Sequence, residues 1–438
     1  MSANVLQTAT PFDLVGGPDK EKLVAAYKGN PLDALRTPAL VVDRAVFRRN
    51  CELMHENAKQ WGDVFRAHVK SHKTAEGTRM QLISSADKTD AIVVSTLMEA
   101  HGVVQAGLVA DGTVKDILYG LPVALNKVED LSSLWDVIAP FGAIVRLLID
   151  HPEQIKFLET FEQSRAQPRR WSVFVKVDCG SKRAGLKANT PVFQELLKSI
   201  FSSPAISVHG FYTHGSKSYG SKSVSEASSH LSTELDAVNA AAGVALEFLK
   251  SNPELTGPSK PFVLAVGSTP SAHVATAEAR AQIKAHLNGI LEIHAGNYPL
   301  LDLQQVNTSL VDQRRVAQRV VSTVVSYYPG RGKDGTDEAL CDAGAIAMSK
   351  DTGLKPGFGE VLGKPWSLGR LSQEHGVLTQ TGLVEREEDK VKVGDMIEIV
   401  GQHACLILAA YPWYYVVDSD ADSKGEVVED VWVPWKGW

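Results

Sequence analysis

Cysteine is scarce in this sequence: 438 residues contain only four, at positions 51, 179, 341 and 405. They lie far apart and none belongs to a Cys-x-x-Cys pair, which excludes a disulfide scaffold and a zinc ribbon and indicates a reducing compartment. Positive charge is not in excess either, since 45 Lys and Arg against 51 Asp and Glu give a net charge of -6. That balance excludes a broad basic surface for nucleic acid or anionic membrane.

Long hydrophobic runs are also missing. The longest one, 404–417, is interrupted by Pro412 and is too short to cross a bilayer. The first ten residues lack the basic and apolar regions of a signal peptide, and the last three match no targeting tripeptide. We therefore expect a cytoplasmic protein. Its 44% hydrophobic and 22% charged residues are typical of a globular chain, and its length allows two or three domains.

What the sequence does contain is a regular alternation of short apolar runs and longer amphipathic segments. After a helix that Asp43 can cap, eight candidate strands follow: 64–69, 91–95, 116–119, 144–149, 172–177, 206–211, 262–266 and 290–293. Most are unbroken apolar runs with room for a crossover helix between them, as buried parallel strands require. Eight such units predict an α/β fold with a TIM (β/α)8 barrel. A doubly wound sheet is the competing architecture, but no Gly-x-Gly-x-x-Gly follows a strand.

Beyond Asn297 the helical periodicity fades. Strand-like pieces appear among Gly- and Pro-rich turns at 319–328, 391–400, 404–408 and 414–417. This part of the sequence predicts a second, mostly β domain.

The first barrel strand ends in the basic stretch 66–74, which contains Lys70. A lysine at a buried strand end is poorly solvated as an ammonium ion, so its amine becomes a nucleophile suited to a Schiff base with a carbonyl compound. The alternative interpretation is a basic stretch that turns outward into solvent.

Further polar and small residues follow the later strands. Arg183 comes after the fifth strand, and His214 and Tyr219 come after the sixth. Small residues with free backbone amides follow the seventh and eighth, where TIM barrels hold phosphate: Gly267, Ser268, Thr269, Gly296, Asn297 and Tyr298. Each loop alone is also ordinary turn chemistry. Together, opposite a lysine, they predict a pocket for a phosphorylated aldehyde such as pyridoxal 5'-phosphate (PLP).

The β domain contains His403 and Cys405 within the segment Gly-Gln-His-Ala-Cys. On a strand, side chains two residues apart point to the same face, so both could reach one ion. Imidazole and thiolate together suit zinc. Ordinary core packing is the alternative interpretation.

These residues lie in segments that resemble the eukaryotic D-serine dehydratases, especially the fungal ones. With the D-threonine aldolases, these belong to the alanine racemase-like, fold-type III PLP enzymes. The similarity runs from Thr37 to about Tyr414 and is carried by RAHVKSHKT (66–74), VVSTLMEA (93–100), DILYGLP (116–122), KVDCGSKRAG (176–185), FYTHGSKSYG (211–220), GSTPSAH (267–273), EIHAGNYPLLDLQQ (292–305) and GQHACLI (401–407). One departure is Ala67, which stands where the family has proline.

The resemblance implies a role for each of these residues. Lys70 would be the Schiff-base lysine, Arg183 would lie near the phenolic oxygen of the cofactor, His214 would pack beside its ring, and Tyr219 would lie at the pocket. The phosphate ligands would be Ser268, Thr269, Gly296, Asn297 and Tyr298. His403 and Cys405 would bind zinc, where D-threonine aldolases have His-x-Asp.

The resemblance also implies a domain organisation and an activity. Residues 1–43 would join the β domain through the strand 39–42, residues 44–310 would form the barrel, and residues 311–438 would form the β domain. We expect a homodimeric lyase that uses PLP and zinc to convert D-serine to pyruvate and ammonia. The alternatives are a D-threonine aldolase, a dehydratase of D-threonine or threo-3-hydroxyaspartate, a racemase, and a PLP-binding protein without turnover.

Overall fold

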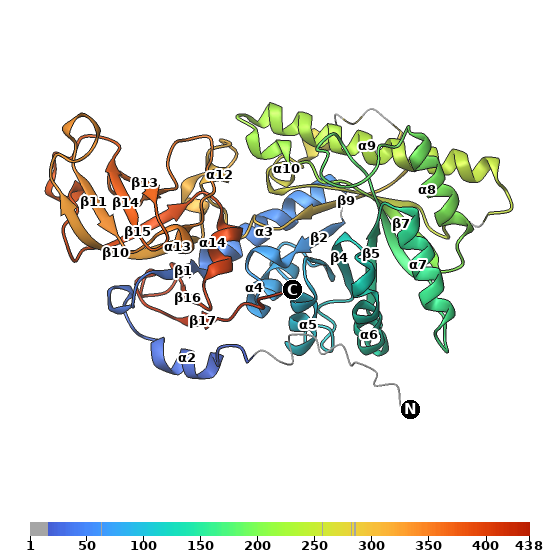
Figure 1. Cartoon of the computed structure of the whole chain (residues 1–438), viewed down its shortest axis with the longest axis horizontal. Helices are drawn as coiled ribbons and strands as arrows, with labels where there is room; N and C mark the ends of the chain where they lie inside the picture. Colours follow the sequence, from blue (N-terminus) through green and yellow to red (C-terminus); the bar gives the residue numbers. More distant parts are fainter. Residues whose placement is uncertain (1–15, 63, 256, 282, 284–285) are drawn as a thin grey trace.

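The computed structural model of the chain describes residues 16–438, except 63, 256, 282 and 284–285. A barrel and a β domain lie side by side, with the short helices α12 (Leu303–Val306) and α14 (Ala404–Ala410) between them (Figure 1). Of the predicted N-terminal segment, residues 1–15 lie outside the described part.

The barrel is a closed sheet of parallel strands in sequential order. Its strands are β2 (Phe65–His68), β3 (Ala91–Val94), β4 (Asp116–Pro122), β5 (Ile144–Ile149), β6 (Trp171–Lys176), β7 (Ile206–Tyr212), β8 (Phe262–Val266) and β9 (Gly289–Ala295). All eight predicted barrel strands are present, and the predicted TIM barrel is confirmed.

Helices follow the strands around the outside of the barrel (Figure 1). They are α3 (Arg44–Trp61), α4 (Ala75–Leu82), α5 (Leu97–Gln105), α6 (Val128–Ile138), α7 (Pro152–Gln163), α8 (Pro191–Ser202), α9 (Val224–Ser251), α10 (Thr269–His273) and α11 (Ala277–Ala281). Helix α3 begins as expected, because the Asp43 carboxylate accepts hydrogen bonds from the amides of Ala45 and Val46. In the described part of the chain, no helix combines the length and the apolar character needed to span a membrane.

The second domain is built on a nine-stranded sheet with the order β11-β14-β13-β12-β15-β10-β1-β16-β17. An added pairing of β10 with β11 curls this sheet back on itself. The strands are β1 (Ala39–Asp43), β10 (Gln318–Tyr328), β11 (Glu338–Cys341), β12 (Gly359–Val361), β13 (Trp366–Leu371), β14 (Gly376–Gln380), β15 (Met396–Gly401), β16 (Tyr414–Val417) and β17 (Asp430–Trp432). The predicted mostly β domain is confirmed. The early strand β1 lies between β10 and β16, while the division at 43/44 and 310/311 stays a prediction.

One predicted strand is wrong: residues 404–408 belong to helix α14. A short apolar run does not distinguish a strand from a buried helix. The helix is favoured because the carboxylate of the distant residue Asp302 accepts a hydrogen bond from the Ala404 amide at 2.9 Å. The predicted strand 391–400 is also shorter than expected, since a turn at Gly394, with φ +93°, precedes β15.

The interior of the barrel contains a cluster of buried, paired charges. Arg66 is buried and donates to Asp116 at 2.6 Å and to Glu292 at 3.0 Å. Although burial acts to raise it, the pKa of Glu292 is lowered by Arg66 and by His294, whose Nε2 lies 2.6 Å from the Glu292 carboxylate. His294 in turn stacks on the ring of Tyr212, with centroids 4.7 Å apart. These buried contacts order the barrel interior below the residues at the carboxyl ends of the strands.

Candidate active site

A cavity of about 620 Å³ opens at the carboxyl ends of the barrel strands and reaches the β domain. Eleven of the twelve predicted site residues line it: Lys70, Arg183, His214, Tyr219, Gly267, Ser268, Thr269, Gly296, Asn297, His403 and Cys405. Residues more than 330 positions apart in the sequence therefore share one space. Tyr298 is the exception.

Lys70 lies one residue beyond β2, in the short turn η2 (Val69–Ser71). The Nδ1 atom of His68 accepts a hydrogen bond from the Lys70 amide at 3.4 Å, which begins this turn and brings the half-buried lysine to the cavity. The next residue, Ser71, has its Oγ 3.0 Å from the Sγ of Cys405. The predicted nucleophile and the predicted thiol ligand are thus held close to one another.

The two predicted phosphate loops are joined directly. The Thr269 hydroxyl accepts a hydrogen bond from the Asn297 amide at 3.1 Å. Gly267 has φ +132°, and a Cβ there would lie 2.3 Å from the carbonyl oxygen of His294. A Cβ at Gly296 would lie 3.0 Å from His68. Both glycines therefore permit a close backbone approach that larger residues would obstruct.

The two predicted tyrosines differ in position. Tyr298 is fully buried, and its ring packs edge-on against Phe65 with centroids 5.8 Å apart, so its side chain belongs to the core. Tyr219 lines the cavity beside His214, with ring centroids 6.4 Å apart. Burial raises the pKa of the Tyr219 hydroxyl, which also interacts with the backbone amide of Thr269. Tyr219 is therefore a neutral hydroxyl beside the phosphate loop.

His214 is held in one tautomer. Its Nδ1 lies 2.9 Å from the carbonyl oxygen of Gly267, which can only accept, so Nδ1 donates. Burial, with the nearby charges of Lys70 and Arg183, lowers the pKa of His214 well below its usual range. His214 is thus a neutral imidazole.

Lys176, at the end of β6, is a second amine in the cavity. Its Nζ lies 3.8 Å from the centre of the Tyr212 ring and has no hydrogen-bond partner among the residues that the structure describes. Burial, and then the charge of Arg183, lower the pKa of Lys176 to about 7. An unsatisfied buried amine is costly unless a bound group satisfies it.

His403 and Cys405 interact at the start of α14 rather than on a strand, with His403 at its N-cap. Burial opposes ionisation of both, yet their interaction raises the pKa of His403 to about 9 and lowers that of Cys405. Each group therefore favours the charged form of the other. The Nδ1 atom of His403 is engaged by the Asp351 carboxylate.

The donor set fits a zinc ion with an open coordination position. A thiolate and an imidazole are ligands that zinc prefers, and a carboxylate on Nδ1 fixes the ring so that Nε2 can face a metal. In the part of the chain that the structure describes, no group of three or more His, Cys, Asp or Glu could hold a metal ion. Water or substrate would have to supply the other ligands.

The residues present also fit PLP. The cavity combines the amine of Lys70, two glycine-bearing loops and the cations Lys176 and Arg183, which suit an anionic phosphate. Within the described part of the chain, the buried side-chain oxygen of Asn297 and the amine of Lys176 have no hydrogen-bond partner, and both residues line this space. Such orphaned polar groups indicate a polar ligand.

Sequence reasoning missed several residues that shape this site. Lys176 lies at the end of the predicted strand 172–177 and begins the motif KVDCGSKRAG. Its place at a strand end, like that of Lys70, could have identified it as a site residue. Asp302 and Asp351 act on Ala404 and His403 from distant parts of the chain, so no local pattern reveals them.

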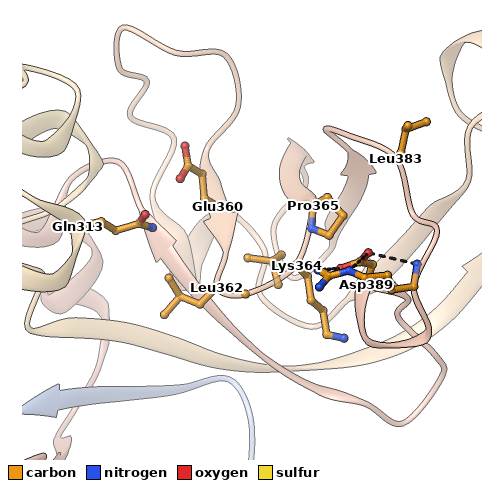
Figure 2. Close-up of a pocket in the computed structure, with 10 residues that line it drawn as sticks. Gln313, Glu360, Leu362, Lys364, Pro365, Leu383 and Asp389 are labelled. Atoms are coloured by element: carbon orange, nitrogen blue, oxygen red, sulfur yellow. Dashed lines mark hydrogen bonds and ion pairs between the residues drawn. The ribbon is translucent and has the colours of Figure 1, made fainter.

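A second cavity of about 490 Å³ lies in the β domain (Figure 2). Its charged groups already have partners: Lys364 donates to the carbonyl oxygens of Glu388 and Lys390, and Arg386 donates to Asp389. It offers no unpaired group comparable to Lys176.

Two family models match the chain: "Alanine racemase, N-terminal domain" over residues 42–252 and "Putative serine dehydratase domain" over residues 317–417. The barrel, the added β domain and the cavity between them thus define a protein of the alanine racemase-like class. The D-serine dehydratase of Schizosaccharomyces pombe is 38% identical over all of both chains, and that of Saccharomyces cerevisiae is 34% identical over 95% of this chain and 99% of its own. The chain belongs to the D-serine dehydratase family, as its motifs predicted.

A solved structure gives the same result for the fold. D-threo-3-hydroxyaspartate dehydratase from Delftia sp. HT23 is 26% identical, with a TM-score of 0.75 over 93% of this chain and all of that one. The same enzyme has been solved as a cysteine-to-alanine mutant in the metal-free form.

Proposed function

We propose that this protein is a D-serine dehydratase that uses PLP and zinc to convert D-serine to pyruvate and ammonia. One observation carries the proposal: Lys70 and the His403–Cys405 pair line the same cavity and are linked through Ser71 and Cys405. A β-elimination needs both a base for the α-proton and an acid for the leaving hydroxyl. The relatives named D-serine dehydratase support the choice of substrate.

Lys70 would hold the cofactor aldehyde, and the phosphate would bind the loops of Ser268, Thr269, Gly296 and Asn297. The buried side chain of Tyr298 leaves only its backbone amide for that role. Arg183 and Lys176 would face the anionic oxygens of the cofactor, and His214 would pack beside its ring. When bound, PLP supplies an electron sink for the charge that cleavage of the Cα–H bond leaves behind.

The chain's own groups then move the protons. The amine of Lys70 accepts the α-proton of the substrate as a general base. His403 and Cys405 hold the metal on the β-domain side of the cavity, next to the Lys70 turn. Zinc supplies a Lewis acid for the departing β-hydroxyl. Loss of water followed by uptake of water conserves all atoms between D-serine and pyruvate plus ammonia.

A panel of D-amino acids tests the proposal. The purified protein, loaded with PLP and zinc, should form pyruvate and ammonia from D-serine faster than it forms 2-oxobutyrate from D-threonine or oxaloacetate from D-threo-3-hydroxyaspartate. Release of glycine and acetaldehyde from D-threonine would instead indicate an aldolase. Formation of L-serine alone would indicate a racemase, and no turnover of any substrate would indicate a cofactor-binding protein.

We further propose that the active form is a homodimer, as the resemblance implies. Light scattering of the PLP-loaded protein should give twice the mass of one chain. A mass of one chain at the enzyme concentration that supports full turnover would contradict this.

A further inference from the structure

Asp302 lies between the phosphate loop and the metal pair, and it is completely buried. One of its carboxylate oxygens, Oδ2, accepts two hydrogen bonds: one from the side-chain amide of Asn297 at 2.6 Å and one from the backbone amide of Ala404 at 2.9 Å. The other oxygen accepts from the Gln305 amide at 3.1 Å. Three donors from three segments thus converge on one side chain.

The two partners of Oδ2 belong to different sites. Asn297 lines the cavity at the predicted phosphate loop, and its own side-chain oxygen has no partner. Ala404 lies between His403 and Cys405, so the hydrogen bond that holds its amide also holds the backbone of the two predicted metal ligands. A shift of the Asp302 carboxylate therefore moves a group in each site.

Gln304, two residues after Asp302, adds a second connection to the segment of His403. The backbone amide of Gln304 donates to the carbonyl oxygen of Gln402 at 3.1 Å, and its side chain donates to that of Thr352 at 3.0 Å. Gln402 precedes His403, and Thr352 follows Asp351, which engages the His403 ring. The start of α12 thus holds both the residue that precedes His403 and the segment that contains Asp351.

Burial of Asp302 restricts the arrangement of its hydrogen-bond partners. Burial raises the pKa of Asp302, while the hydrogen bond from Ala404 and the charge of His403 act in the opposite direction. A buried carboxylate that loses one of its donors bears a desolvation cost, so each of the three bonds favours the arrangement in which the other two are made. Ordering of one partner consequently favours ordering of the others.

We propose that Asp302 is a positioning residue that couples the two sites, so that binding of PLP at the Asn297 loop tightens binding of zinc by His403 and Cys405, and the reverse. This inference rests on the proposed function for the identity of the two ligands. Because coupling between binding equilibria is reciprocal, each ligand strengthens the other by the same factor. The Asp302 side chain is not among the groups that line the cavity.

The experiment measures the zinc dissociation constant of the full-length protein with and without saturating PLP, by competition with a chromophoric chelator. For the wild-type chain we expect PLP to tighten zinc binding about fivefold or more. Asp302→Asn offers one acceptor oxygen to three donors, so we expect weaker zinc binding. The ratio of the zinc dissociation constants without and with PLP should be near one.

A second variant keeps the test valid if Asp302→Asn does not fold. Asn297→Ser removes one arm and keeps the bond between Asp302 and Ala404, so the variant should still bind zinc. At a PLP concentration shown to saturate this variant, the effect of PLP on zinc binding should disappear. Asp312→Asn is the matched control, because Asp312 caps an exposed turn through the Arg314 amide at 2.8 Å and lies outside the cavity. It should retain the wild-type ratio.

Hydrogen exchange of the peptide that spans residues 402–408 gives a second readout. Addition of PLP to the metal-free wild-type protein should slow exchange in this peptide, and should not do so in Asp302→Asn. An equal PLP effect in wild type and Asp302→Asn, or no PLP effect in wild type, would overturn the inference. Both readouts omit substrate, so a protein that shows the coupling but forms no pyruvate would contradict only the proposed function.

Discussion

The Oγ of Ser71 and the Sγ of Cys405 lie 3.0 Å apart, at the contact between the barrel and the β domain. Ser71 follows Lys70, and Cys405 lies in the first turn of α14, which packs against the Lys70 turn. This contact brings the turn that carries Lys70 next to the helix that carries Cys405, within one cavity. The packing of the two domains therefore sets how far the Lys70 amine lies from the residues that would hold zinc.

Lys70 should be the residue that holds PLP. Borohydride reduction of the loaded protein should attach the cofactor covalently to the peptide that contains Lys70, and Lys70→Ala should abolish the adduct. Lys73→Ala is the control, because Lys73 pairs with Glu99 at 3.1 Å and is not among the residues that line the cavity. An adduct on Lys176, whose low pKa leaves about half of its amine neutral near pH 7, would show that the assignment is wrong.

Thr269→Val should weaken PLP binding. The variant keeps the shape of the side chain but removes the hydroxyl that accepts from the Asn297 amide, so it loosens the joint between the two phosphate loops. The same hydroxyl would also donate to the phosphate, and loss of that charge-assisted bond, worth about 1.5–3 kcal/mol, corresponds to a dissociation constant raised by roughly one to two decades. Equilibrium dialysis measures the effect. Thr190→Val, at the cap of the distant helix α8, should leave the constant unchanged; equal weakening in both variants would mean a general loss of stability.

At saturating PLP, removal of zinc should stop dehydration while the cofactor stays bound. We expect about one zinc per chain. A chelator should abolish pyruvate formation and leave exchange of the α-proton, which depends on Lys70, partly intact. Cys405→Ser should bind zinc weakly, whereas Cys179→Ser, which alters a half-buried cysteine not found in the cavity lining, should behave as wild type. If protein verified to lack metal forms pyruvate at the wild-type rate, His403 and Cys405 serve core packing and not metal binding.

Glu234 should make stability depend on pH. This residue is fully buried on α9 and accepts from the Gly267 amide at 2.9 Å and from the Ser271 hydroxyl at 3.0 Å. Burial raises its pKa from the ordinary 4.5 to about 8, although these hydrogen bonds oppose the shift. Because the folded pKa is the higher one, the stabilising contribution of the protonated group is complete below the unfolded pKa and is lost as the pH rises through about 8.

Urea unfolding of wild type and Glu234→Gln, both without cofactor, measures this contribution. Between about pH 5.5 and pH 8 the free energy of unfolding of wild type should fall relative to the variant, by at most about 1.4 kcal/mol per pH unit. Glu247→Gln, an exposed position on the same helix, should run parallel to wild type. A constant difference between wild type and Glu234→Gln across this range would mean that Glu234 is ionised throughout.

Local sequence patterns were enough to predict the barrel. Strands that are buried on both faces must be apolar, and parallel strands must be separated by crossovers, so both requirements are visible locally. The quoted motifs identified the family, and the rule that barrel sites lie at the carboxyl ends of strands located Lys70, His214 and the loops of Thr269 and Asn297.

Tertiary structure decided the rest of the site. The segment 404–408 forms a helix because a buried carboxylate 102 residues earlier satisfies its first amide, and no local pattern in an apolar run contains that information. The side chain of Tyr298 packs into the core although its neighbour Asn297 faces the cavity. Asp302 and Asp351 act on His403 and its neighbour only because the fold brings distant segments within hydrogen-bond distance. Periodicity along a chain records which face of an element is buried, whereas a hydrogen bond between distant segments depends on where the elements pack.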